Sequence, residues 1–87
     1  MREIEVFGLG KVEIPHKLFG AFKLRLIPMP AMVVLCALLA EEPQTVEDLR
    51  AKTALALALP KWLKWLAGQG FVLVQGGKVY LNRRHPL

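Results

Sequence analysis

The stretch LPKWLKWLAGQGFVLV (residues 59–74) contains a helical pattern, two glycines and the start of a β-rich run. Proline fits the first turn of a helix, and glycine frequently lies just beyond the last turn. We therefore predict a helix over about 59–68, ended by Gly68 and Gly70. This short helix carries two tryptophans, two lysines and no acid, so it must be divided into a core face and an outer face.

The helical period of 3.6 residues makes that division. Leu59, Leu63 and Leu66 share the predicted core face, with Trp62 beside them. Pro60, Lys61 and Lys64 point away from it. Trp65 lies on the border, where a partly buried core role and an exposed contact are equally compatible with the pattern. For the two lysines the alternatives are contact with a partner and simple solvation.

The segments that flank this helix carry equally local signals. Downstream, Gln75-Gly76-Gly77 separates FVLV from KVYL, and Gly-Gly between two β-rich runs predicts a hairpin. Upstream, TVEDLRAKT (45–53) begins with Thr45 and has Asp48 three residues later, which predicts a capping box and a helix over 46–53. The connecting ALALAL is either a turn or the first turn of the next helix.

The N-terminal part alternates between apolar and polar residues. REIEVFGLGKVEI (2–14) does so around Gly8-Leu9-Gly10, which predicts a hairpin. FKLRLI (22–27) alternates again, with Phe22, Leu24 and Leu26 on one face, and predicts a third strand. We expect the three strands to form a small antiparallel sheet with one face in water.

Residues 31–41 are apolar nearly all round, which predicts the central core helix. Pro30 suits its first turn, and Glu42-Pro43 ends it. Cys36, the only cysteine, lies within this helix and is expected to be a small buried apolar side chain.

Charge is distributed unevenly along the chain. The formal net charge is +5, all seven acids lie at or before Asp48, and residues 49–87 hold seven basic side chains and no acid. A segment whose charged side chains are all basic favours a polyanion as partner, with an anionic membrane as second choice. The simplest alternative is that the basic residues serve solubility alone.

The side chains available lead us to expect that the chain is not an enzyme. The chain has no serine, one aspartate, one cysteine and two histidines near opposite ends, so no catalytic triad, cofactor site or metal cluster is expected. The longest apolar run, residues 26–40, is shorter than the ~20 residues that span a bilayer. Without a signal-peptide pattern, we expect a cytoplasmic protein.

The capped helix, the short turn, the helix at 59–68 and the glycine hairpin together resemble the winged helix-turn-helix. With the N-terminal strands included, the chain looks like the DNA-binding domain of OmpR-type response regulators and related bacterial activators. The resemblance implies an α+β winged-helix domain over 1–87: N-terminal antiparallel strands (1–27), a three-helix core (30–70), a wing hairpin (71–82) and a basic tail (83–87).

The resemblance also implies a partner, double-stranded DNA, and a way of binding it. The helix at 59–68 would enter the major groove and the hairpin would act as a wing. The DNA contacts so assigned are Lys61, Lys64, Trp65, Lys78, Arg83, Arg84, Arg50 and Lys52. Lysine contacts go mostly to phosphates, which position a protein without specifying a sequence. For Arg83 and Arg84 a flexible solvated tail is a strong alternative, and for Arg50 and Lys52 a surface role is equally compatible with the sequence.

Two features depart from that family. The connection between the second and third helices is short, and the third helix has few of the Arg, Asn and Gln side chains that read bases. A protein–protein or dimerisation module is therefore the alternative function. Binding to a membrane surface through the Lys/Trp helix is the least favoured, and no small-molecule ligand is indicated.

Overall fold

The structure, a computed structural model, describes residues 2–6 and 10–82. In chain order the elements are β1 (Arg2–Val6), β2 (Gly10–Ile14), α1 (His16–Lys23), α2 (Met29–Ala40), β3 (Gln44–Thr45), α3 (Val46–Thr53), a 3₁₀ turn η1 (Ala56–Ala58), α4 (Leu59–Gly68), β4 (Val72–Gln75) and β5 (Lys78–Leu81). The fold is α+β, as predicted from the sequence. None of the helices within the described residues is long and apolar enough to cross a membrane.

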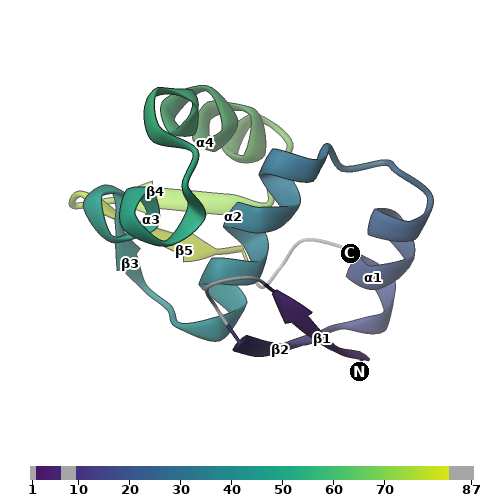
Figure 1. The fold of residues 1–87 in the computed structure, drawn as a ribbon. Helices are drawn as coiled ribbons and strands as arrows, with labels where there is room; N and C mark the ends of the chain where they lie inside the picture. Colours follow the sequence, from purple (N-terminus) through teal and green to yellow (C-terminus); the bar gives the residue numbers. More distant parts are fainter. Residues whose placement is uncertain (1, 7–9, 83–87) are drawn as a thin grey trace.

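Helix α2 lies at the centre and packs against β2, α3, α4 and β5 (Figure 1). Its buried side chains are Ala31, Val34, Leu35, Cys36, Ala37 and Leu38. The prediction of a central core helix is therefore confirmed. The helix begins two residues before the predicted start, and Pro30 lies in its first turn, where no amide hydrogen is needed.

Strands β1 and β2 form an antiparallel pair of their own, from Arg2 opposite Ile14 to Val6 opposite Gly10. The predicted strands are confirmed. Of the predicted turn Gly8-Leu9-Gly10, residues 8 and 9 lie outside the described part of the chain, and Gly10 begins β2. Val12 and Ile14 are buried, and β2 contacts α2. This pair therefore closes one side of the core.

The predicted third strand over 22–27 is wrong. Residues 16–23 form helix α1, which buries Leu18, Ala21 and Phe22. Those three positions have the i, i+3, i+4 spacing of one helical face. Leu24 and Leu26, read as the inner face of a strand, are exposed. Their alternation with Lys23 and Arg25 therefore does not reflect burial, and the expected three-stranded N-terminal sheet is a two-stranded one.

Helix α1 ends in a Schellman motif. Leu26 N–H donates to Ala21 O and Arg25 N–H donates to Phe22 O, each at 3.0 Å. The motif needs a left-handed residue just beyond the helix, and here that residue is Arg25, with φ of 60°. Glycine is usual at this place because a Cβ is strained there.

The second sheet has the order β3-β5-β4, antiparallel throughout. The hairpin β4–β5 is confirmed, and Gly76 and Gly77 both have positive φ, 59° and 76°, as a type I′ turn requires. The two-residue strand β3 was not predicted from the sequence. It pairs Gln44 with Val79 and thereby attaches the hairpin to the start of α3.

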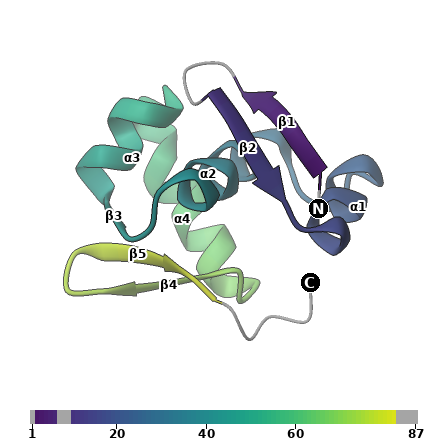
Figure 2. The same cartoon turned by 90° about the horizontal axis from the view of Figure 1, so that it is seen from below.

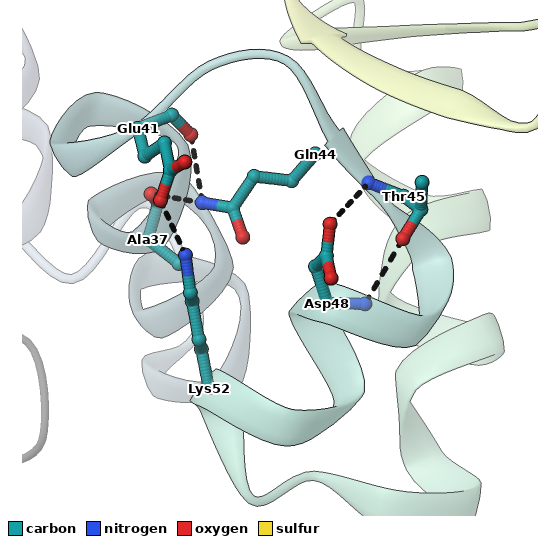
Figure 3. A network of polar contacts seen from close by, with 6 residues as sticks. All are labelled: Ala37, Glu41, Gln44, Thr45, Asp48 and Lys52. Carbon is teal, nitrogen blue, oxygen red and sulfur yellow. Dashed lines mark hydrogen bonds and ion pairs between the residues drawn. The ribbon is translucent and has the colours of Figure 1, made fainter.

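Helices α3 and α4 have the bounds predicted for them. At the start of α3, Asp48 N–H donates to Thr45 Oγ1 (3.1 Å) and Thr45 N–H donates to the Asp48 carboxylate (3.4 Å), so the capping box is confirmed (Figure 3). For the segment between α3 and α4, the sequence allowed either a turn or the first turn of the next helix. The structure shows a turn: Ala54 is left-handed, and the 3₁₀ turn η1 leads into α4.

Candidate functional site

The two faces of α4 lie as the helical period predicts. Leu59, Leu63 and Leu66 are buried, whereas Lys61 and Lys64 are exposed. The leucines anchor the helix on the core, and α4 contacts both α2 and β4. Because the anchored face fixes the rotation of the helix, the two lysines are held on its solvent side.

Trp65, the border residue, is half-buried and packs between two aromatic neighbours. Its ring stacks on Phe71 at a centroid distance of 6.3 Å and an interplanar angle of 17°. Trp62 meets it edge-on, also at 6.3 Å. Stacking on Phe71 joins the end of α4 to the residue that precedes β4. Most of the role of Trp65 is therefore structural, and only its exposed edge is available to a partner.

Lys61 and Lys64 differ in what surrounds them. The Lys61 ammonium lies 5.2 Å from the centroid of the Trp62 ring, within cation–π range. Neither lysine takes part in an ion pair within residues 2–6 and 10–82. Both ammonium groups are thus left to solvent or to an anionic partner.

Arg50 and Lys52, on α3, are paired with acids. Arg50 lies 3.5 Å from the Glu47 carboxylate one helical turn away. Lys52 donates to the Glu41 carboxylate at 2.7 Å, which links α3 to the end of α2 (Figure 3). A phosphate contact by Lys52 would have to break this link, so Lys52 is the less available of the two.

Lys78 begins β5 and is exposed at the turn of the hairpin. Its backbone pairs with Thr45, directly before the first turn of α3. That turn carries the acids Glu47 and Asp48, so the charge around Lys78 is mixed. Arg83 and Arg84, also predicted to contact DNA, lie outside the described residues.

The described part of the chain from α4 to β5 holds Lys61, Lys64 and Lys78 and no acid. The arrangement can bind phosphate groups. Burial raises the pKa of the Cys36 thiol to about 11, so that the thiol stays protonated near neutral pH. Residues 2–6 and 10–82 contain no group of three His, Cys, Asp or Glu that could hold a metal ion.

Sequence reasoning missed two polar residues that hold this half of the molecule together. Gln44 is buried and donates from Nε2 to Ala37 O and Glu41 O, both at 2.7 Å (Figure 3). The Glu42 carboxylate accepts the Leu81 N–H at 2.6 Å. A weak signal was available for Gln44, since its amide can donate and it follows shortly after an apolar helix whose last carbonyls need donors.

Comparison of the chain with models of known protein families, with curated proteins and with solved structures found no match. Its function is therefore inferred from the geometry and charge of the site.

Proposed function

We propose that this chain is a DNA-binding transcriptional regulator of the winged-helix type, with α4 in the major groove and the β4–β5 hairpin as wing. The observation that carries the proposal is the division of α4: three buried leucines lie on one face, and on the other lie two exposed lysines that form no ion pair with the residues that the structure describes. A helix of ten residues is ~15 Å long. The major groove of B-DNA, about 12 Å wide, accepts a helix of this kind.

The surroundings of α4 support the proposal. A capped helix, a turn, a second helix and a hairpin follow one another, as in the pattern that the sequence shares with winged helices. Figures 1 and 2 show α3 and the turn of the hairpin on the same side of the molecule, away from α1. Because β4 contacts α4, the hairpin would lie beside a duplex held by α4.

The chemistry of the site predicts the kind of DNA binding. Lys61 and Lys64 would contact phosphates, and α4 offers no Arg, Asn or Gln to read base edges. We expect affinity to depend strongly on salt and weakly on the sequence of the duplex.

The test measures binding of a fluorescent duplex by anisotropy at low salt. Lys61→Glu with Lys64→Glu should weaken binding by more than about tenfold, about 1.4 kcal/mol. The matched control, Lys11→Glu with Lys17→Glu, makes the same change in net charge at exposed sites outside α4 and should bind like the wild type. Circular dichroism establishes that both variants fold. Equal loss in the two variants would reduce the proposal to an effect of net charge.

A protein-interaction module is the second candidate, and one observation favours it. Leu57, in the turn that leads into α4, is 93% exposed. A fully exposed leucine beside the candidate site suits a protein contact better than a phosphate backbone. Absence of duplex binding at low salt, together with a concentration-dependent dimer weakened by Leu57→Ser, would favour this function over DNA binding.

A further inference from the structure

We propose that the pocket between the end of α1 and the start of α2 binds an acidic amphipathic segment of a partner protein. An apolar side chain of that segment would enter the pocket, and its carboxylates would pair with Lys23 and Arg25. This surface is separate from α4, and the proposal does not rest on DNA binding.

The pocket has a volume of about 410 Å³. Its apolar lining comes from Phe22, Ile27, Pro28, Met29 and Met32. The volume falls within the range of ~300–1,000 Å³ that is usual for ligand sites. Two methionines in the lining make the pocket adaptable, because their unbranched side chains repack around different partners.

The same segment exposes large apolar side chains next to the pocket. Leu24, Leu26 and Met29 are 72%, 64% and 69% exposed. Isolated exposed apolar side chains are ordinary, but here three lie within six residues, alternate with residues that line the pocket and include the lining residue Met29, so that a partner at the pocket could bury them.

Charge determines the kind of partner. Lys23 and Arg25 line the pocket, and neither takes part in an ion pair within the described residues. Residues 14–40 contain no acid at all. The pocket is therefore apolar inside with cations at its edge, which complements an apolar anchor flanked by carboxylates.

The backbone at Arg25 gives an independent indication. Its φ of 60° is a left-handed conformation that costs a non-glycine residue ~1–2 kcal/mol. Glycine would close the same Schellman motif without that strain. Backbone strain that persists at the edge of a pocket is a recognised mark of functional sites, and here it keeps a guanidinium beside the pocket.

Amphipathic segments that place apolar anchors in a groove are a recurring mode of protein recognition. A membrane surface would also offer anionic and apolar groups, but it is flat, whereas this patch is hollowed by a pocket. Figures 1 and 2 place α1 on the opposite side of α2 from α3 and the hairpin turn. A segment bound here would leave that side of the molecule free.

The test selects binders from a random peptide library displayed on phage, with the whole chain immobilised. We expect the enriched peptides to combine Asp or Glu with large apolar residues. Binding of a synthetic copy should fall at least about tenfold in Lys23→Glu with Arg25→Glu, because the cations become anions. The control, Lys11→Glu with Lys17→Glu, should bind like the wild type. Leu26→Ser should weaken binding without adding charge.

Several results would overturn the proposal. The proposal is wrong if no peptide is enriched or if the enriched peptides lack acids. It is also wrong if the charge reversal at Lys23 and Arg25 leaves binding unchanged. Tighter binding to vesicles containing an anionic phospholipid, lost in that same variant, would assign the surface to a membrane. A dimer seen by sedimentation and lost in that variant would assign it to a second copy of the chain.

Discussion

Gln44 is a buried polar residue at the junction between α2 and α3. It is 2% exposed, and its amide donates to two carbonyl oxygens at the end of α2. Its own Oε1 is buried without a hydrogen-bond partner among the described residues. Two hydrogen bonds are thus gained while one acceptor is left unsatisfied, which offsets part of the gain.

Replacement of Gln44 should show how much its hydrogen bonds contribute to the unfolding free energy. Gln44→Met keeps the length of the side chain and loses both donated bonds, so we expect a loss of about 1–3 kcal/mol of unfolding free energy. Gln75→Met, the same change at an exposed position, should stay within about 0.5 kcal/mol of the wild type. Urea denaturation measures both, and equal stability of Gln44→Met and wild type would contradict this role.

The variant Gln44→Glu should make stability depend on pH. A carboxylate would face the Ala37 and Glu41 carbonyl oxygens, so burial and repulsion raise the pKa of the introduced group in the folded state. The protonated carboxyl can still donate one hydrogen bond. Stability should therefore be highest below the unfolded pKa, about 4.3, and fall as the pH rises through the raised value. Urea denaturation at several pH values checks this trend.

Cys36 provides a second titration at the residue scale. Burial raises the pKa of its thiol from 9.0 to about 11. Between these values the unfolded chain loses the proton that the folded chain retains, so unfolding becomes easier as the pH rises from 9 to 11. Relative to Cys36→Ala, we expect the wild type to lose about 2 kcal/mol of unfolding free energy over this window.

A thiol reagent should label Cys36 quickly only after unfolding; fast labelling of the folded chain would contradict its burial.

At the scale of elements, the ends of the helices explain how the segments are joined. Helix α3 ends at Thr53 and is followed by its C-cap residue Ala54, which is exposed and left-handed with φ of 56°. The capping box at the other end satisfies amide groups that the helix itself leaves free. The start of α3 is therefore stabilised by its capping box. At the other end the backbone of Ala54 is strained, and its methyl group faces solvent.

Ala54→Gly should relieve this strain and raise the unfolding free energy by about 1 kcal/mol. The matched control is Ala51→Gly, exposed within the same helix, where glycine should cost about 1 kcal/mol. Thermal unfolding followed by circular dichroism compares the two. A shift of the same sign in both variants would mean that the left-handed conformation of Ala54 carries no strain.

The small sheet is completed by side chains as well as by strands. Strand β3 has only two residues, so the Leu81 N–H lies beyond its pairing with β5. The Glu42 carboxylate accepts that N–H and extends the edge by one hydrogen bond. At the base of the hairpin, the Asn82 side chain donates to Gly70 O at 2.8 Å. These contacts hold the hairpin against α2 and α4.

At the scale of the whole molecule, basic groups are presented on two sides of α2. Lys61 and Lys64 lie on α4, whereas Lys23 and Arg25 line the pocket at the end of α1. Lys52, by contrast, is paired with Glu41. The basic side chains behind the net charge of +5 are therefore not gathered on one surface, and the two surfaces can be tested separately.

Salt dependence tests the DNA surface at this scale. Each neutralised phosphate contributes ~0.9 to the slope of log K against log salt. Lys61→Gln with Lys64→Gln should therefore lower the magnitude of the slope by about 1.8, while Lys23→Gln with Arg25→Gln should leave it unchanged. Titrations at several salt concentrations measure the slopes. Equal changes in both variants would mean that DNA does not distinguish the two surfaces.

The sequence by itself determined the elements whose signals lie within a few residues. The capping box at Thr45 sets the start of α3, Pro60 and Gly70 bracket α4, and Gly76-Gly77 makes the type I′ turn. Each depends on backbone chemistry that acts locally. The leucine face of α4, and with it the exposure of its lysines, follows from the helical period alone.

Only the tertiary structure decided the rest. The residues from Phe22 to Ile27 alternate like a strand, yet Phe22 is buried at the end of α1 and the pocket opens beyond it. The pairing of β3 with β5 and the link from Lys52 to Glu41 join residues 11 to 35 positions apart. Gln44 bonds to carbonyl groups close to it in the sequence, but its burial depends on how the core closes around it. The physical reason is that these features depend on which surfaces meet when the core closes.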